Sequence, residues 1–232
     1  MGKNNQNWKR YAYEFLSIFI AVTSAFALNN WSANRRDSNS EDKILREIKN
    51  GLQLDLQDFD GNKKGHAISI RSGQVFRDLV YGRSVAQDSL PLFYVSLFRD
   101  YTPIINLSGY ESLKSSGLEI LKNDDLRFEI ITLYDFYYEI ISKLEDDIIE
   151  MRSFSNYYHQ INDLLYKNMV FDDHGRLKEF SQPLNLSEDE KKEMLSYLWR
   201  IEHNRVYKLG RYNLIQERMR VLIQHIDEEL EK

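Results

Sequence analysis

The feature that most constrains this chain is an apolar stretch near its start, Tyr11–Leu28, in which Glu14 is the only charged residue. At a helical rise of about 1.5 Å per residue, about 18 residues extend over about 27 Å, which approaches the thickness of the hydrocarbon core of a bilayer. Trp8 and Trp31 flank the stretch, and indole rings prefer the headgroup region of a membrane. Residues 11–31 are therefore predicted to form a transmembrane anchor.

The rest of the chain has the composition of one helical domain. The sequence has 232 residues, of which 29% are charged, and its mean hydropathy of −0.55 argues against a second span. It contains only 3 Pro and 10 Gly residues, which favours long helices. We therefore expect a short tail over residues 1–10 and a helical domain over residues 32–232, large enough to bury a core.

Several classes of function are disfavoured by what the sequence lacks. Its net charge of −5 argues against nucleic-acid binding, which calls for a basic field. It has no cysteine, so it forms no disulfide, thiolate metal site or thiol nucleophile. The 5 histidines are scattered, and no hydrolase or nucleotide-binding motif is present. No catalytic, cofactor-binding or metal-binding residue is predicted, and the chain is not expected to be an enzyme.

The apolar stretch also fits a cleaved signal peptide. A carboxylate at the head of the apolar run and polar residues within it favour an uncleaved anchor, but cleavage after Ala27 stays open. A buried core helix is disfavoured by the basic residues and indole rings at the ends of the stretch. The signal peptide would consist of a basic region with Lys3, Lys9 and Arg10, an apolar region over Phe15–Ser24 and an A-x-A cleavage site at Ala25–Ala27.

The layout of the chain indicates the orientation of the anchor. Basic residues are nearly balanced across it, because Arg35 and Arg36 follow the span as Lys9 and Arg10 precede it. A short tail before the span and a large domain after it are typical of a signal anchor. We therefore predict a single-pass protein of a bacterial inner membrane, with its domain in the periplasm.

Helical spacing places Glu14, Ser17, Ala21 and Ser24 on one stripe of the span. Small residues allow spans to approach closely, and an intramembrane carboxylate rarely faces lipid. The stripe is therefore a candidate membrane-helix interface, at which a second copy of the chain or another membrane protein would bind within the lipid bilayer. Alternatively, Glu14 lies at the headgroup level and pairs with Arg10, four residues earlier.

Beyond the anchor, apolar residues at helical spacing predict a helix up to Gly82. Ser38–Glu41 has the pattern of a capping box that would start this helix. The membrane helix could also continue into it as a stalk, because residues 29–50 contain no Pro or Gly. We expect one long helix with a bend near Gly61–Gly65, or two nearly collinear helices.

Caps and breakers divide the next part of the chain. Ser89–Pro91 starts a short helix, and a capping box at Ser108–Glu111 starts another one, which ends at Gly117. An Asn cap then opens a long helix over residues 123–169, since no Gly or Pro interrupts it. A kink around residues 145–155 would keep that helix within a domain of ordinary size.

The last part of the chain contains a turn and a final helix. Asp172–Gly175 has turn chemistry, and residues 176–186 are expected to form a loop around Pro183. A capping box at Ser187 then starts a helix that runs to the C-terminus. No strand pattern is apparent. The predicted fold is all-α: a transmembrane helix followed by an elongated antiparallel bundle of three long helices with short connecting helices.

Two sets of side chains stand out on these helices. An aromatic set is expected to lie mainly in the core, with a ligand pocket as the alternative. A basic set on the last helix is expected to meet acids such as Asp135 and Glu139 inside the bundle, with an external anionic partner as the alternative. The aromatic set comprises Tyr134, Tyr137, Tyr138, Tyr157, Tyr158, Tyr166, Phe128 and Phe136, and the basic set comprises Arg200, Arg205, Lys208, Arg211, Arg218 and Arg220.

The candidate bundle corner or ligand site consists of Tyr110, Glu111, Lys114 and Tyr134. The first three lie on a short helix that glycines punctuate at both ends. A helix of this length is unstable alone, so packing must hold it. A structural corner explains this pattern without any ligand, and a ligand site is the alternative.

The anchor and the corner together resemble a known family. The opening is Glu14 and an apolar span that ends in Leu28–Trp31, and the second block is Tyr110–Gly117 followed by Asn123 and Leu126-Arg127. This pattern is similar to that of short single-pass membrane proteins of Bacteroidetes-type bacteria, which share a domain of unknown function. The resemblance implies an uncleaved anchor and a helical domain. It implies no activity.

The sequence thus favours a membrane-anchored scaffold or interaction module that acts through protein contacts. The alternative is an extracytoplasmic sensor that binds a small ligand within the helical bundle. An enzyme would need convergent polar groups in a cleft, and the sequence indicates none.

Overall fold

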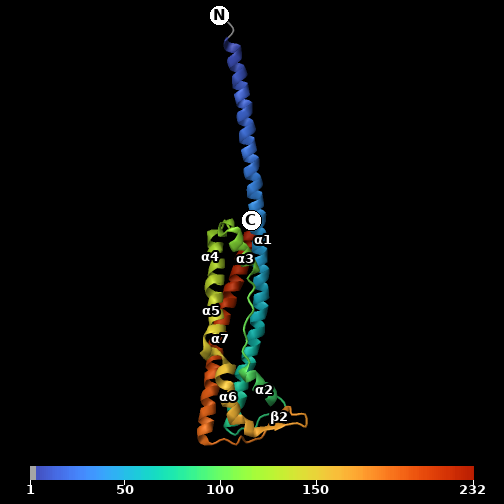
Figure 1. Ribbon diagram of the computed structural model, residues 1–232, viewed down its shortest axis with the longest axis vertical. Helices are drawn as coiled ribbons and strands as arrows, with labels where there is room; N and C mark the ends of the chain where they lie inside the picture. The colour runs from blue at the N-terminus through green and yellow to red at the C-terminus, as the bar shows by residue number, and fades with distance from the viewer. Residues whose placement is uncertain (1–3) are drawn as a thin grey trace.

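The computed structural model describes residues 4–232, and two long helices dominate it. Helix α1 (Asn4–Val80) has 77 residues, and helix α7 (Glu188–Leu230) has 43 residues. The C-terminal half of α1 lies antiparallel to α7, while the N-terminal half of α1 projects alone (Figure 1). The prediction of an all-α fold is confirmed in its broad form. Residues 1–3 of the predicted tail, including Lys3, lie outside the described residues.

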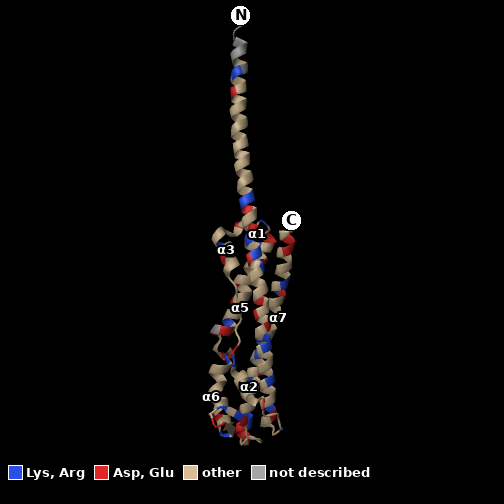
Figure 2. Cartoon of the chain, turned by 90° about the vertical axis from the view of Figure 1, so that its right-hand side faces the viewer, with Lys and Arg blue, Asp and Glu red and all other residues tan. Residues whose placement is uncertain are grey.

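The projecting part of α1 carries the apolar stretch. Its large apolar side chains are exposed from Trp8 to Trp31, and Figure 2 shows an uncharged segment between the charges near its two ends. It is the one helix among the described residues that is long and apolar enough to cross a membrane, with a mean hydropathy of 1.6 in its best window. At the start of this stretch, Arg10 Nε donates to Glu14 Oε1 at 3.1 Å.

Helix α1 continues from the apolar stretch into the domain without interruption. The helix start predicted at Ser38–Glu41 is wrong, and Ser40 Oγ donates to the Arg36 carbonyl within the helix. A cap is not needed there, because carbonyls of the preceding turn already accept from these N–H groups. The alternative of two helices is also wrong. Phe59 and Phe76, on either side of Gly61–Gly65, are buried, and this packing outweighs the low helix propensity of glycine.

Short helices connect α1 to the rest of the domain. These are α2 (Leu90–Phe98), α3 (Ser108–Ser116) and the 3₁₀ turn η1 (Leu118–Ile120). The bounds predicted for α3 are confirmed, but Ser108 does not cap it, because Leu107 takes the N-cap position. Gly109 lies against α1, where a Cβ atom would approach the Ile48 nitrogen to 2.6 Å. Only glycine fits this contact between α3 and α1 without a shift of backbone.

The third long helix is divided into several segments. The chain leaves helical geometry at Ile148 and Arg152, inside the region where a kink was predicted. This column of segments packs against α7 (Figure 1). The segments are α4 (Asp124–Thr132), the π turn η2 (Leu133–Tyr137), α5 (Tyr138–Ser142), the π turn η3 (Lys143–Asp147), the 3₁₀ turn η4 (Ile149–Met151), α6 (Ser153–Leu165) and the 3₁₀ turn η5 (Tyr166–Asn168).

A small hairpin contradicts the prediction that no strand is present. Strands β1 (Met169–Phe171) and β2 (Leu177–Phe180) pair antiparallel around the predicted turn, which the Gly175 N–H closes on the Asp172 carbonyl at 2.9 Å. Strands this short show no alternation along the sequence. Tertiary packing holds the hairpin, since the Phe180 ring is buried against Phe76 and Tyr94, each at a centroid distance of 5.7 Å.

The domain has two apolar cores, one above the other along α1 and α7. The first includes Ile48, Leu52 and Ile215, and the second includes Phe76 and Leu198. Buried polar residues of α1 and α7 lie between the two cores in the sequence of both helices. The predicted corner lies beside the first core, and this polar layer separates the first core from the second.

Candidate functional site

The structure brings three of the four predicted corner residues together. The Tyr110 ring from α3 stacks on the Tyr134 ring from η2, with centroids 4.5 Å apart and planes 11° from parallel. Lys114 Nζ lies 4.6 Å from the centroid of the Tyr110 ring. Both tyrosines are buried, whereas Glu111 is exposed and takes no part in the stack.

A buried carboxylate behind this stack was not identified from the sequence. Asp55 Oδ1 accepts from the Asn106 backbone N–H at 2.9 Å and from Asn106 Nδ2 at 2.5 Å, and Asp55 Oδ2 accepts from the Tyr138 hydroxyl at 2.7 Å. The Tyr138 ring lies edge-on to Tyr134, at 5.2 Å. We refer to Asp55, Asn106, Tyr110, Tyr134 and Tyr138 as the Asp55 cluster.

The charge of Asp55 has no cationic partner in this cluster. Burial raises the pKa of the Asp55 carboxyl, and the hydrogen bonds from Asn106 and Tyr138 oppose that rise. Burial and the nearby Asp55 raise the pKa of Tyr138. The signal that could have revealed the cluster is an aspartate at a core position of α1, between Leu52 and Phe59.

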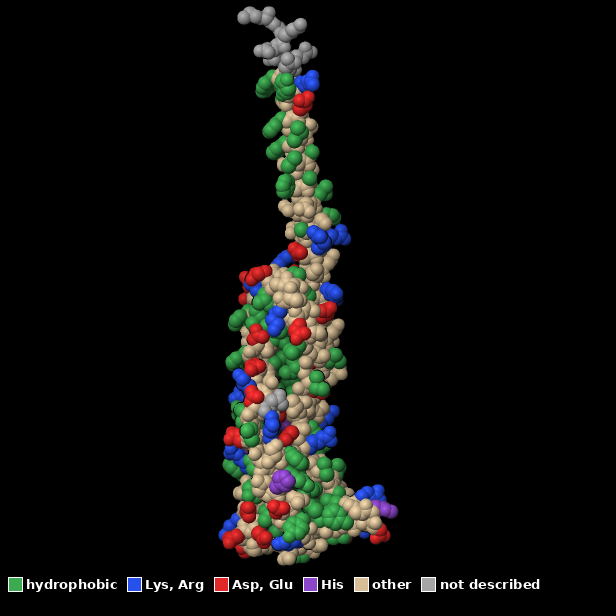
Figure 3. Space-filling view, viewed as in Figure 1, with side chains coloured by type: hydrophobic (Ala, Val, Ile, Leu, Met, Phe, Trp, Pro, Cys, Tyr) green, Lys and Arg blue, Asp and Glu red, His purple; other side chains and the backbone are tan. Residues whose placement is uncertain are grey.

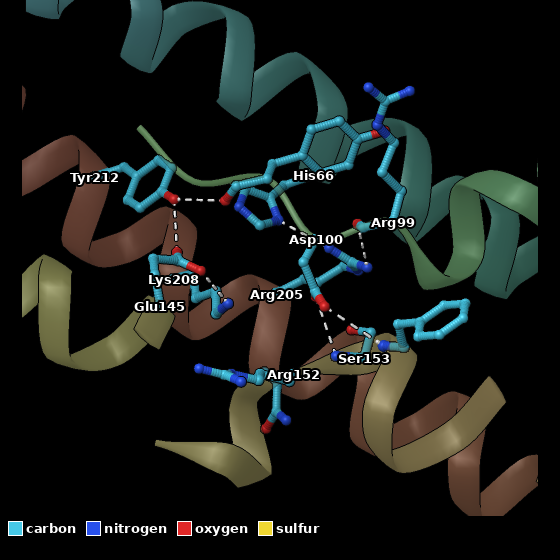
Figure 4. Close-up of polar contacts among 12 residues, drawn as sticks. His66, Arg99, Asp100, Glu145, Arg152, Ser153, Arg205, Lys208 and Tyr212 are labelled. Carbon is cyan, nitrogen blue, oxygen red and sulfur yellow. Dashed lines mark hydrogen bonds and ion pairs between the residues drawn. The ribbon is translucent and has the colours of Figure 1, made fainter. Parts of the chain in front are cut away.

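A second buried cluster lies in the polar layer between the two apolar cores (Figure 4). We call His66, Glu145, Arg205, Lys208 and Tyr212 the Arg205 cluster. The guanidinium of Arg205 donates to the carbonyls of Leu97 at 3.1 Å and Arg99 at 2.9 Å, and it lies 3.0 Å from His66 Nδ1. Because an arginine is only a donor, His66 Nδ1 must accept, which assigns the neutral Nε2–H tautomer.

Electrostatics agree with a neutral His66. Burial, followed by the charges of Arg205 and Lys208, lowers the pKa of His66 to about 3. Burial also lowers the pKa of Arg205, whereas Asp100 and Tyr101 oppose that shift.

Glu145, from the π turn η3, supplies the negative charge of the Arg205 cluster. Its Oε2 accepts from Lys208 Nζ at 2.5 Å, and its Oε1 accepts from the Tyr212 hydroxyl at 2.6 Å. A second acid, Asp100, lies near Arg205 and accepts from the Ser153 N–H at 3.0 Å, at the start of α6. The cluster therefore connects α1, α7, the start of α6 and the segment after α2.

The Arg205 cluster is enclosed rather than open to solvent. The rings of Tyr101 and Tyr212 contact His66 edge-on, each with a centroid distance of 5.4 Å. Two buried nitrogens, His66 Nε2 and Arg205 Nε, have no hydrogen-bond partner among the described residues. An enclosed network of this kind determines packing and specificity, and it gives no group that an external substrate could reach.

The basic set divides between the core and the surface. Arg205 and Lys208 are buried in the Arg205 cluster, and Arg200 lies 3.6 Å from Glu150. The prediction that the basic set meets acids of the opposing segments is confirmed for Lys208 with Glu145 and for Arg200 with Glu150, but the two acids named, Asp135 and Glu139, do not receive these cations. The chain directs those two acids elsewhere, because Asp135 accepts from the Tyr110 hydroxyl at 2.8 Å and Glu139 lies 3.3 Å from Lys143.

Only part of the aromatic set lies in the core. Tyr134 and Tyr138 are buried, but Phe128, Phe136 and Tyr166 are exposed, contrary to the prediction.

Exposed apolar side chains also gather near the end of the domain opposite the anchor (Figure 3). A surface groove of about 380 Å³ there is lined by Tyr94, Val95, Phe98, Arg99, Phe154 and Tyr158 of α2, α6 and the residue after α2.

The predicted stripe on the anchor is exposed along its length. Glu14, Ser17, Ala21 and Ser24 all face the surroundings of a lone helix. Glu14 binds Arg10 as the alternative interpretation expects, and Ser17 Oγ donates to the Glu14 carbonyl at 2.8 Å. The interface itself stays a prediction.

The comparisons with known proteins leave the family open. Neither a family model, nor a curated protein, nor a solved structure matches this chain. The resemblance to the Bacteroidetes-type family therefore stays a prediction. Among the side chains that the structure describes, no group of three or more from His, Cys, Asp or Glu is placed to hold a metal ion.

Proposed function

We propose that this chain is a single-pass membrane protein whose antiparallel helical bundle acts through protein contacts, as an anchored scaffold or interaction module. The observation that carries the proposal is the continuity of α1. One helix contains both the exposed apolar stretch and the packed side of the domain. The anchor and the domain are therefore joined by a continuous helix rather than by a flexible hinge, so that a displacement or rotation of the anchor would move the domain with it.

The continuity of α1 sets the distance between the membrane and the far end of the domain. About 49 residues of α1 separate Trp31 from Val80, which corresponds to about 74 Å at 1.5 Å per residue. The apolar groove around Val95 and Phe154 would then lie far from the lipid, within reach of partners in the aqueous phase. A large exposed apolar area of this kind is typical of interaction surfaces.

The ends of the exposed stretch support a span that remains uncleaved. Arg35 lies over the Trp31 ring at 5.5 Å, and Arg10 binds Glu14 at the other end. Cationic and indole groups at both ends suit the two headgroup regions. We propose that the anchor lies in a bacterial inner membrane as a signal anchor, with the domain in the periplasm.

Protease protection in spheroplasts tests both the side and the cleavage. We expect external protease to degrade the domain in intact spheroplasts, and the purified protein to have the mass of the full chain. Protection of the domain would overturn the periplasmic assignment. A mass that lacks the first 27 residues would overturn the anchor.

We further propose that the anchor pairs with a second copy or with another membrane protein through Glu14, Ser17, Ala21 and Ser24. Single-cysteine variants test the pairing without background, since the chain has no native cysteine. Copper-induced oxidation in membranes is expected to cross-link Ser17→Cys or Ser24→Cys. The matched control is Val22→Cys on the opposite side of the span. Equal cross-linking of all three variants, or of none of them, counts against the stripe.

The ligand-binding alternative receives no comparable support. At the predicted corner, the Tyr110 and Tyr134 rings stack directly on one another.

A further inference from the structure

The outer face of α7 carries an apolar row that no element of the domain covers. Tyr207, Leu214 and Val221 are seven residues apart and are 41%, 40% and 37% exposed. The core face of the same helix, with Tyr212 and Met219, is fully buried. A surface helix normally presents polar residues on its outer side. A seam that packs on another helix uses apolar residues at the a and d positions of each heptad, and this row supplies the a positions, while the d positions are Gly210, Glu217 and Gln224.

Two arginines accompany this row at the same spacing. Arg211 lies 5.1 Å from the Tyr207 ring centroid, and Arg218 lies 5.7 Å from the Tyr137 ring centroid. Arg211 uses its Nε and one terminal nitrogen on the Tyr207 hydroxyl, at 3.3 and 3.1 Å. Among the described side chains, neither guanidinium forms an ion pair. Both guanidinium groups retain N–H donors that can bind a carboxylate in the bidentate geometry that arginine favours.

A groove lies directly beside the two rows. It has a volume of about 180 Å³ between α4–η2 and α7, and Phe128, which is 70% exposed, forms part of its wall. Val221 and Arg218 line the opposite wall. The apolar floor and the arginine rim are therefore adjacent on one surface.

We propose that this surface binds an amphipathic helix of another protein that carries acidic residues seven positions apart beside its apolar seam. In heptad terms, Tyr207, Leu214 and Val221 occupy a positions, and Arg211 and Arg218 occupy e positions. Residues at e and g select the partner by charge. Acidic g positions on the incoming helix would meet both arginines. This inference rests on the proposed function, and it specifies the chemistry of the partner.

Charge argues against a second copy of the chain as the occupant. In a parallel pair, Arg211 and Arg218 would face the g positions of the other copy, which are Val206 and Asn213. In an antiparallel pair, the arginines of both copies would face one another. Two acids lie on this surface. Glu217 is turned toward Arg220 at 3.9 Å within the same helix, and Glu129, which lines the groove, lies 2.7 Å from His225 Nδ1.

A matched pair of peptides tests the proposal on the full chain in nanodiscs. Both are synthetic helices of about four heptads with Leu at a and d, and they carry either Glu or Lys at e and g. By fluorescence anisotropy at low salt, we expect the Glu peptide to bind about tenfold more tightly than the Lys peptide. The double variant Arg211→Glu/Arg218→Glu is expected to reverse this order.

Two control variants distinguish binding at this surface from a general effect of net charge and from misfolding. Lys64→Glu/Arg71→Glu makes the same change of charge on the exposed side of α1 and should leave the order of the peptides unchanged. Leu214→Ala should weaken the Glu peptide while the circular dichroism spectrum stays the same. Equal affinities for both peptides, or an order that both double variants reverse alike, would overturn the proposal.

Self-association is the remaining alternative, and the same samples test it. If the wild-type chain dimerises in detergent and Leu214→Ala abolishes the dimer, the surface belongs to a second copy and the proposal fails. The peptide assay needs neither a cell nor a known compartment. A failed spheroplast experiment would therefore count against the proposed membrane topology, and a failed peptide experiment would count against this surface alone.

Discussion

The Asp55 cluster and the Arg205 cluster use opposite means to keep charge inside the same helical domain. Asp55 is buried without a cation, and neutral donors from Asn106 and Tyr138 surround it. Arg205 and Lys208 are buried as cations. The guanidinium of Arg205 donates to the Leu97 carbonyl, and the ammonium of Lys208 donates to the Glu145 carboxylate. A carboxyl group can become neutral when its pKa rises, whereas an arginine keeps its proton in proteins.

The Asp55 cluster therefore depends on hydrogen bonds from neutral donors, and the Arg205 cluster depends on charge compensation. Both clusters take side chains from a π turn of the broken column, Tyr134 from η2 and Glu145 from η3. Such turns are frequent where a side chain must be placed for a specific contact. The predictions below test the difference between the clusters, and they refer to the full chain in nanodiscs.

Glu145→Gln is expected to cause the largest loss. It leaves Lys208 buried without a counter-charge, and removal of one partner of a buried ion pair costs about 3–5 kcal/mol. Urea unfolding followed by circular dichroism measures this loss. Glu139→Gln is the control, because Glu139 pairs with Lys143 at an exposed site, and a loss below about 1 kcal/mol is expected. Similar losses for the two variants would contradict charge compensation.

Asp55→Asn is expected to lower the free energy of unfolding by less, about 1–3 kcal/mol, which is the usual cost of leaving a buried polar group without a hydrogen bond. The amide keeps one acceptor but directs an N–H group toward Asn106 or Tyr138, which are donors. The exposed Asp147→Asn serves as the control in the same urea titration. If Asp55→Asn destabilises the protein as strongly as Glu145→Gln, the two clusters do not differ as proposed.

The two clusters should respond to pH with opposite signs. His66 has a folded pKa of about 3 against an ordinary value of 6.5, so the unfolded chain binds more protons between these values. Its contribution to stability therefore falls on acidification, by up to about 1.4 kcal/mol per pH unit. The pKa of Asp55 is raised above its ordinary value of 3.8, so the folded chain binds more protons just above that pH. Its contribution rises on acidification and is lost as the pH rises through the folded pKa.

Difference titrations separate the two contributions. His66→Gln should flatten the dependence of the unfolding free energy on pH between about 6.5 and 3. Asp55→Asn should steepen the loss of stability on acidification just above pH 3.8. Changes of the same sign in both variants would refute the proposed protonation states.

Tyr110→Phe is expected to have the smallest effect, about 0.5–1.5 kcal/mol. It removes the hydrogen bond to Asp135 but keeps the ring stacked on Tyr134, and Asp135 is exposed to water. Tyr138→Phe should cost more, because it withdraws a donor from the buried Asp55. Thermal denaturation of the two variants in parallel gives the comparison, and a greater loss for Tyr110→Phe would reverse it.

Local signals in the sequence predicted much of the layout correctly. Asn123 caps α4 through the Leu126 N–H, and Ser187 and Glu190 form the capping box of α7. Tyr110 and Tyr134 both belong to the predicted corner, and the structure stacks their rings. The carboxylate behind them was not anticipated. Its partners Asn106 and Tyr138 are 51 and 83 residues away in the chain, and periodicity does not report such distances.

Local signals in the sequence account for α7, the turn at Asp172–Gly175 and the apolar stretch of α1, because caps, glycines and apolar spacing act over a few residues. Only packing in three dimensions explains why a hairpin forms around Phe180 and why Lys208 meets Glu145 rather than Asp135. The structure also selects the continuous α1 from the two helix starts that the sequence leaves open. Residues 34–40 of α1 are exposed, and their N–H groups are satisfied within the helix, whereas the hairpin and the Lys208–Glu145 pair depend on burial by residues distant in the chain. The free energy of that packing exceeds the small local preferences that opposed it.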